Sequence, residues 1–288
     1  MDRFFVITNA DRDQGCEKAL QIEEYLTKRG RICDHVAIER DSAPDSEEIT
    51  KIREIPEDTE AVLVLGGDGT FIQSAGLLGP RQIPLIGVNL GHRGYLAEID
   101  KENITDALDK LIDGEYTVTD RMMLSGTPVI DGKNSGGFYA LNDIVVRTSD
   151  ARVGKFSIEV NGTHLTTMSA DGIIVATPTG STAYNMSAGG PIVEPGSAMI
   201  VLTPICPLDT VSRSVVLSAA DTIVIRLIKP SGRGNGATGV YFDGRGDHML
   251  SSDDELIIRK AEASIRLIKL SKESFLEVLS RKMNARAQ

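Results

Sequence analysis

The stretch Leu65-Gly66-Gly67-Asp68-Gly69-Thr70 decides how the first part of this chain folds. It follows the apolar run 61–64 and precedes an amphipathic run over 71–78, which together predict a buried strand, a glycine turn and a helix. Glycines let the backbone turn tightly and let a ligand approach the peptide plane. Because successive backbone N–H groups at a helix start bind anions, we expect Gly66, Gly67, Gly69 and Thr70 to contact phosphate.

Asp68 is unusual inside an anion-binding turn because its carboxylate repels phosphate. That placement suits a carboxylate that binds a metal ion or accepts a proton from a substrate hydroxyl. The alternative is that Asp68 caps the following helix. The complete string over 66–70 favours a functional site at Asp68 over a helix cap. Because this string contains no basic residue, we expect Mg²⁺ to neutralise the bound phosphates.

Strand and helix signals alternate over the first part of the chain. Strands are predicted at 4–7, 31–38, 61–65 and 84–89, and helices at 14–29 and 104–112. Such alternation predicts a Rossmann-like α/β domain with a parallel sheet, which we place at 1–118. Ligands of these sheets bind beyond the carboxyl ends of the strands, where Asp68 lies.

The pattern changes after residue 116 to short runs of strand-forming residues. Asp131-Gly132 and Asn161-Gly162 each separate two runs, which predicts hairpins. The predicted strands are 122–130, 138–146, 156–160, 164–168, 172–177, 199–203, 222–228, 238–242, 255–260 and 265–270. We therefore expect an α/β plus β fold, with an antiparallel β-rich domain at 119–270. A C-terminal helix within 271–288 is expected to return and pack on the first domain.

Composition excludes several classes of protein. The formal net charge of −10 argues against a general nucleic-acid binder, which needs a basic face. The three cysteines have no paired spacing, and the four histidines share no metal-ligand spacing. No apolar run is long enough for a signal peptide or a membrane span. We expect a cytoplasmic protein that binds no nucleic acid, enters no membrane and contributes no metal-ligand cluster of its own.

A second informative stretch is DGIIVATPTGSTAYNMSAGGP at 171–191. A strand is predicted to end at Thr177, and small hydroxyl residues then open a short helix that Ser181 or Thr182 could cap. The flat, hydroxyl-bearing ring of Tyr184 suits stacking on adenine. The alternative is a packed turn whose hydroxyls satisfy their own backbone. The density of Thr, Ser and Gly favours a binding loop.

The dipeptide Asn142-Asp143 precedes the apolar run 144–146. An amide that donates and accepts, beside a carboxylate that accepts from two hydroxyls, suits a ribose diol. Turn chemistry explains this dipeptide equally well.

Taken together, these motifs resemble the bacterial NAD kinase family, whose members use ATP or polyphosphate. The resemblance rests on GGDGT at 66–70, GVNLGHRGYLAEI at 87–99, the Asn-Asp pair at 142–143, DG…TPTGSTAY at 171–184 and LTPICP at 202–207. It covers about residues 61–270. GGDG alone is shared with diacylglycerol and sphingosine kinases, whereas TPTGSTAY after GGDG is much more specific.

The resemblance implies a site in the cleft between the two domains, where ATP with Mg²⁺ phosphorylates the 2′-hydroxyl of the adenosine ribose of NAD to give NADP. Asp68 matches the proton acceptor, and Tyr184 belongs to the loop around the adenine. Asp171 matches a carboxylate that reaches the nicotinamide from a neighbouring subunit, in a homodimer or homotetramer. The implied NAD-binding residues are Asp68, Gly69, Asn142, Asp143, Arg152, Ser169, Asp171, Thr182, Ala183, Tyr184, Asn185, Met186, Ser187 and Arg245.

The chain departs from the family pattern at several positions. Leu208 and Asp209 follow Pro207 where the family has a His and a hydroxyl residue, and Ser214 stands where a Pro is usual. Arg245 occupies a position that is often Gln, and Asp143 one that is often Glu. Most of these departures concern contacts at the nicotinamide side and between subunits rather than the reaction.

Two other functions remain open from the sequence. A lipid kinase would share GGDGT but lack the TPTGSTAY loop, and its acceptor pocket would be apolar. A non-catalytic dinucleotide sensor would have no use for a carboxylate beside phosphates. The sequence leaves open whether ATP or polyphosphate is the donor, whether NAD or NADH is the acceptor, and whether NADP regulates the protein.

Overall fold

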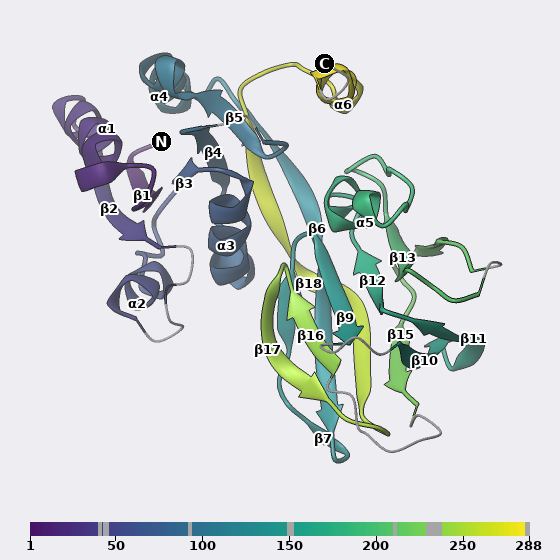
Figure 1. The fold of residues 1–288 in the computed structure, drawn as a ribbon. Coiled ribbons are helices and arrows are strands. Elements are labelled where there is room, and N and C mark those ends of the chain that lie inside the picture. The colour runs from purple at the N-terminus through teal and green to yellow at the C-terminus, as the bar shows by residue number, and fades with distance from the viewer. Residues whose placement is uncertain are drawn as a thin grey trace. The chain divides into compact units, whose positions relative to one another are not determined.

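The chain, seen here as a computed structural model, divides into two compact units (Figure 1). The structure describes residues 1–39, 42, 46–91, 94–148, 153–209, 212–228 and 238–285. The first unit comprises Met1–Asp120 and Ser264–Gln288, and the second comprises Arg121–Ala263. Both boundaries fall inside long strands, β6 (Thr117–Ile130) and β18 (Glu255–Lys269), so each of these strands contributes to both units.

The first unit is built around a parallel sheet. Its strands are β1 (Arg3–Asn9), β2 (Ile32–Ile38), β3 (Ala61–Gly66), β4 (Leu85–Asn89) and β5 (Ala97–Asp100). They lie in the order β4-β3-β1-β2, and the outer edge of β4 pairs with β5 and with Leu267 of β18. This arrangement confirms the α/β class that the alternation of strands and helices predicts.

Helices cover both faces of this sheet because its strands are apolar on both faces. The helices are α1 (Glu17–Lys28), α2 (Glu47–Arg53), α3 (Asp68–Leu78) and α4 (Ile104–Asp113), with 3-10 turns η1 (Gln14–Cys16), η2 (Gly79–Arg81) and η3 (Lys101–Asn103). Phe4 and Val6 share one core with α1 and α4, while the neighbouring Phe5 and Ile7 are buried on the other face. Period-2 alternation thus places successive side chains of β1 on opposite faces.

The second unit contains two antiparallel sheets packed face to face. The six-stranded sheet has the order β14-β13-β12-β9-β16-β17, and in the other sheet β11, β10 and β15 lead to β18, which pairs with β6. The strands are β7 (Lys133–Asn134), β8 (Phe138–Ala140), β9 (Asp143–Thr148), β10 (Gly154–Val160), β11 (Thr163–Ala170), β12 (Gly172–Ala176), β13 (Met199–Ile205), β14 (Val215–Ser218), β15 (Ile223–Leu227), β16 (Thr238–Phe242) and β17 (Arg245–Leu250). One apolar core joins both sheets, which confirms the predicted β-rich part.

Among the described residues of this unit, three Asx-Gly pairs turn hairpins, each with positive φ at both residues. Two of them, Asp131-Gly132 and Asn161-Gly162, are predicted from the sequence, and the third, Asp243-Gly244 between β16 and β17, is not. The strand prediction is wrong in two places. The run 138–146 forms two strands, β8 and β9, and the runs 255–260 and 265–270 belong to one continuous strand, β18.

The C-terminal helix α6 (Phe275–Ala285) belongs to the first unit. Lys282 Nζ lies 3.4 Å from the centre of the Tyr95 ring, a cation–π contact with the segment that precedes β5. Leu276 of α6 is 70% exposed, so the helix buries little of its own apolar surface. None of the helices formed by the described residues has the length and hydropathy needed to cross a lipid bilayer.

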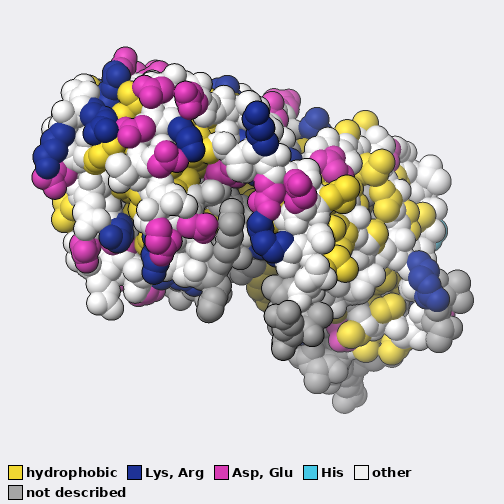
Figure 2. All heavy atoms as spheres, turned by 90° about the horizontal axis from the view of Figure 1, so that it is seen from above, with side chains coloured by type: hydrophobic (Ala, Val, Ile, Leu, Met, Phe, Trp, Pro, Cys, Tyr) yellow, Lys and Arg dark blue, Asp and Glu magenta, His cyan; other side chains and the backbone are white. Residues whose placement is uncertain are grey.

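The two units differ in the surface they show in Figure 2. The visible face of the first unit carries mixed basic and acidic side chains, whereas hydrophobic side chains gather on the visible face of the second unit (Figure 2). Exposed apolar residues of the second unit include Met199, Leu208 and Val216. Contiguous exposed apolar surface is typical of protein contacts.

Candidate active site

The glycine turn after β3 leads directly into α3. Gly67 is the N-cap of this helix in an extended conformation, and no side chain caps it. The helix therefore begins at Asp68, three residues before the predicted amphipathic run. A Cβ at Gly66 would lie 2.6 Å from Thr70 Oγ1, so only glycine fits beside the first helical turn. The uncapped N–H groups of this turn remain able to bind an anion.

Asp68 does not cap α3, so that alternative is wrong. Its carboxylate accepts hydrogen bonds from the backbone N–H groups of Tyr95 (2.7 Å) and Leu96 (3.1 Å). A Cβ at Gly94 would lie 1.8 Å from Asp68 Oδ1, which excludes any residue but glycine there. Each carboxylate oxygen has a second lone pair, so Asp68 is fixed in orientation and can still accept a proton.

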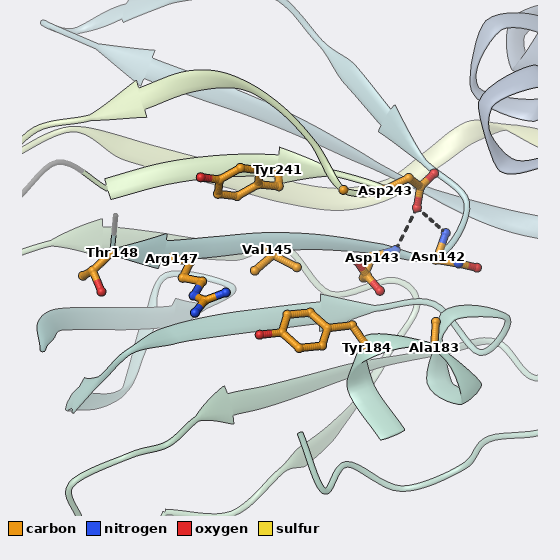
Figure 3. A pocket seen from close by; sticks show the side chains of 10 residues that line it. Asn142, Asp143, Val145, Arg147, Thr148, Ala183, Tyr184, Tyr241 and Asp243 are labelled. Atoms are coloured by element: carbon orange, nitrogen blue, oxygen red, sulfur yellow. Dashed lines mark hydrogen bonds between the residues drawn. The ribbon is translucent and has the colours of Figure 1, made fainter. Parts of the chain in front are cut away.

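The second unit holds a cavity of about 680 Å³ on the outer face of its six-stranded sheet (Figure 3). It is lined by Asn142, Asp143, Val145, Arg147, Thr148, Ala183, Tyr184, Tyr241, Asp243 and Gly244. Successive side chains of β9 point to opposite faces of the sheet. Ile144 and Val146 face the core between the sheets, so the alternate residues Asp143, Val145 and Arg147 face the cavity. The cavity offers aromatic faces beside amide, carboxylate and guanidinium groups.

Asp243 fixes the part of the chain that enters β9. Its carboxylate accepts hydrogen bonds from the backbone N–H groups of Leu141 (2.7 Å), Asn142 (2.7 Å) and Asp143 (3.1 Å). Figure 3 draws the bonds from Asn142 and Asp143. The backbone N–H of Asp243 in turn donates to the carbonyl of Asp143 at 3.0 Å. The hairpin turn of β16 and β17 is thereby attached to Asn142 and Asp143, and it sets where their side chains enter the cavity.

The two carboxylates of the cavity differ in their hydrogen bonding. Burial, and then the charge of Asp243, raise the pKa of Asp143 to about 7. Burial also raises the pKa of Asp243, but three backbone N–H groups and Arg245 act in the opposite direction. Because those donors stabilise the charged form of Asp243, Asp143 is the member of the pair that takes up a proton near neutral pH.

We expect Asp143→Asn to stabilise the protein, and to do so clearly more at pH 8 than at pH 5. The folded-state pKa of Asp143 is raised above its unfolded value of about 3.9, so its contribution to stability is lost as the pH rises towards about 7. The variant removes that loss. Thermal melting of both proteins at the two pH values measures the effect. An equal difference in melting temperature at pH 5 and pH 8 would contradict the assignment.

The hydroxyl residues of the 177–193 loop build the turn itself. Ser181 Oγ donates to the Pro178 carbonyl (2.6 Å) and accepts from Val193 N–H (2.9 Å), while Thr182 Oγ1 donates to the Thr179 carbonyl. The predicted cap is therefore wrong: the N-cap of the short helix α5 (Tyr184–Ser187), which follows η4 (Gly180–Thr182), is Ala183, with no side-chain bond. The buried hydroxyls bond locally because an unsatisfied buried donor is costly.

This turn rests directly on Asn142. A Cβ at Gly180 would lie 2.0 Å from the Asn142 carbonyl oxygen, and Thr177 Oγ1 donates to the Leu141 carbonyl at 2.6 Å. The side chain of Asn185 is fully buried and bonds to Ser181, Pro191 and Thr203. The packed turn thus presents Ala183 and Tyr184 to the cavity, and Tyr184 is 36% exposed.

Sequence comparison assigns both parts of this architecture. Residues 4–116 match the profile described as "ATP-NAD kinase N-terminal domain", and residues 141–270 match the one described as "ATP-NAD kinase C-terminal domain". The chain belongs to the NAD kinase family. This membership confirms the resemblance seen in the sequence motifs.

Relatives within the NAD kinase family match along nearly the whole chain. The NAD kinase of Agathobacter rectalis is 39% identical over 98% of this chain and 99% of its own length. That of Lachnospira eligens is 37% identical over 98% of this chain and 100% of its own. Among solved structures, an Archaeoglobus fulgidus NAD kinase in complex with ATP is 27% identical, with a TM-score of 0.73 over 94% of each chain.

A yeast NADH kinase complexed with NADH shares the fold of this NAD kinase family member. The TM-score is 0.87 at 21% identity, over 98% of this chain and 88% of the yeast chain. This likeness confirms the α/β plus β architecture.

The structure distributes the predicted NAD-site residues over both units. Asn142, Asp143, Ala183 and Tyr184 line the cavity, and Asp68 and Gly69 lie at the start of α3. Arg152 lies outside the described residues. The remaining predicted residues of the second unit do not line the described cavity, and their binding roles stay predictions: Ser169, Asp171, Thr182, Asn185, Met186, Ser187 and Arg245.

Sequence reasoning missed six residues that line the cavity. They are Val145, Arg147, Thr148, Tyr241, Asp243 and Gly244. The period-2 alternation from Asp143 along the strand would have placed Val145 and Arg147 on its face. The pair Asp243-Gly244 after the predicted strand 238–242 is a hairpin signal of the same kind as those at 131–132 and 161–162.

Proposed function

We propose that this chain transfers the terminal phosphoryl group of ATP to the 2′-hydroxyl of the adenosine ribose of NAD, giving NADP. ATP-dependent phosphorylation of NAD is the activity of the family to which the chain belongs. The observation that supports a catalytic role for Asp68 is that its carboxylate is held in a fixed orientation at the start of an uncapped helix. We assign it as the proton acceptor for the ribose hydroxyl.

The chemistry of the cavity supports a dinucleotide acceptor rather than a lipid. Asn142 and Asp143 offer an amide and a carboxyl group for a ribose diol, and Tyr184 and Tyr241 offer flat faces for a heteroaromatic ring. A lipid acceptor would need an apolar pocket, whereas this cavity includes two carboxyl groups and one guanidinium. We therefore assign the cavity to NAD.

The proposed step is an in-line displacement at the terminal phosphorus of ATP. The ribose 2′-oxygen forms the new bond to phosphorus, the bond to the bridging oxygen breaks, and its electron pair leaves with ADP. The 2′-hydroxyl proton passes to Asp68. Mg²⁺ enters as part of the MgATP substrate and supplies charge neutralisation on the phosphates. The uncapped N–H groups of α3 would donate hydrogen bonds to the anionic phosphate oxygens.

Incubation with NAD, ATP and Mg²⁺, read out with an NADP-specific dehydrogenase, tests this function. We expect NADP to accumulate with equimolar ADP. A parallel reaction with diacylglycerol in place of NAD tests the lipid-kinase alternative. NAD binding without any ADP release would instead support a sensor. Polyphosphate and NADH in place of ATP and NAD define the donor and the acceptor.

Tyr184→Ala is expected to weaken NAD binding about 10-fold and to change kcat little. The reason is that stacking of a base on an aromatic ring contributes about 1–3 kcal/mol and is present before and during the reaction. Titration calorimetry with NAD, together with kcat at saturating NAD, measures both effects. A fall in kcat at unchanged affinity would show that Tyr184 does not stack on the dinucleotide.

We also propose that the chain forms homo-oligomers. The exposed apolar residues of the second unit, which include Met199, Leu208 and Val216, support this assembly. Light scattering coupled to gel filtration measures the mass.

A further inference from the structure

Arg12, which follows β1, lies against the glycine turn that carries Asp68. A Cβ built on Gly67 would lie 3.1 Å from Arg12 Nη1, and one built on Gly91 would lie 2.6 Å from it. Glycine at both positions therefore leaves the room that the guanidinium occupies. Although the GGDGT string itself has no basic residue, the fold supplies a cation to it from a distant segment.

The topology of the sheet explains why these segments meet. β1 pairs with β2 on one side and with β3 on the other, so the strand order reverses between β1 and β3. Ligands of open parallel sheets bind at such a reversal, outside the carboxyl ends of the strands. Arg12 follows the carboxyl end of β1, and Asp68 follows that of β3. Both residues thus flank the crevice at which a ligand is expected.

The backbone that carries Arg12 is held on both sides. Arg12 N–H donates to Asn9 Oδ1 at 3.0 Å, and Asn9 Nδ2 donates to Thr70 Oγ1 at 3.3 Å in the first turn of α3. The buried carboxylate of Asp13 accepts from Thr8 Oγ1 (2.8 Å) and from the backbone N–H groups of Lys18 and Ala19. These bonds fix the position of the Arg12 backbone relative to the glycine turn.

The guanidinium itself is free to bind a ligand. The residue is exposed, and within the described part of the chain no carboxylate lies within ion-pair distance of it and no acceptor receives its N–H groups. A clamp that only held the loops together would donate to their carbonyls. A planar guanidinium with free N–H groups instead matches the bidentate geometry of phosphate.

We propose that Arg12 binds the terminal phosphates of ATP and stabilises the phosphoryl group during its transfer. This role rests on the function proposed above. In the transfer, the 2′-oxygen bonds to the terminal phosphorus, the bond to the bridging oxygen breaks towards ADP, and Asp68 takes the proton. Arg12 donates N–H groups to the phosphoryl oxygens and exchanges no proton. The chemical class that this residue recognises is a polyanionic phosphate chain.

Steady-state kinetics of Arg12→Gln and Arg12→Lys test the proposal, with Lys51→Gln as the control. Lys51 lies on α2 in the same unit and pairs with Glu47 at the surface, so its removal makes the same change in net charge. For Arg12→Gln we expect KM for MgATP to rise about 10- to 100-fold, with KM for NAD within about twofold of wild type. Arg12→Lys should recover part of the loss, and the control should match the wild type.

Binding of sodium tripolyphosphate by calorimetry separates this role from the overall activity. Weaker binding to Arg12→Gln than to the wild type supports the phosphate contact even if the wild type forms no NADP, in which case only the proposed function fails. Unchanged KM for MgATP and unchanged tripolyphosphate binding would overturn the proposal. So would a lowered melting temperature accompanied by equal rises in both KM values, because that outcome shows a purely structural role.

Discussion

Replacing Asp68 with Asn is expected to lower kcat by about 10²- to 10⁴-fold while NAD binding is retained. The amide keeps the size of the side chain but cannot accept the proton of the ribose hydroxyl, and general-base assistance contributes a factor of this order. The reaction of MgATP with saturating NAD, followed as NADP, measures kcat, and calorimetry measures NAD affinity. Turnover near that of the wild type would defeat the assignment of Asp68 as proton acceptor.

A structural role of Asp68 has to be separated from this catalytic one. The carboxylate accepts from both Tyr95 and Leu96, and an amide can accept only through its single oxygen. Some loss of stability is therefore expected in Asp68→Asn. If the melting temperature and the NAD affinity fall together with kcat, the loss of kcat comes from a disturbed loop around Tyr95 and Leu96 and not from a missing proton acceptor. A selective fall in kcat identifies the proton transfer.

Asp243→Ala is expected to lower the free energy of unfolding by about 3 kcal/mol and to weaken NAD binding. Three backbone N–H groups, those of Leu141, Asn142 and Asp143, would lose their acceptor, and bonds to a charged group contribute about 1.5–3 kcal/mol each before water replaces part of them. Urea unfolding and NAD calorimetry measure the two effects.

Asp243→Asn serves as the matched control for this change. Asp243 has a φ of 51°, a left-handed conformation that Asn tolerates and Ala does not. Asn also keeps one oxygen for the N–H groups, so we expect it to lose about half as much stability. An alanine variant as stable as the wild type would show that Asp243 does not position the start of β9.

The fold could be predicted where its signals are local. The three buried positions of α1, Ala19, Ile22 and Leu26, recur at helical spacing, and two Asx-Gly hairpins form where the sequence places them. The strand predictions fail where pairing with distant strands decides how far a strand extends. β18 continues through 261–264, where the sequence predicts a break, because its two halves pair with different strands, β15 and β4.

The candidate site was predictable in part for the same reason. Asp68, Asn142 and Tyr184 belong to short motifs whose unusual residue composition can be recognised from the sequence alone. Tyr241 carries no such signal, because it reaches the cavity only through the register that pairs it with Val145 of β9. The hydroxyl residues Ser181 and Thr182 share a motif with Tyr184 but satisfy the turn, since their burial requires local partners.

The sequence by itself determined the alternation of strands and helices, the glycine turn at 66–70 and the order of the motifs that mark the family. These features depend on side-chain periodicity and on the backbone freedom of single residues, which are local properties. The tertiary structure alone decided that Arg12 lies against Gly67 and that Asp243 holds the start of β9. Such contacts join residues far apart in the chain, so they exist only once strand order and register are set.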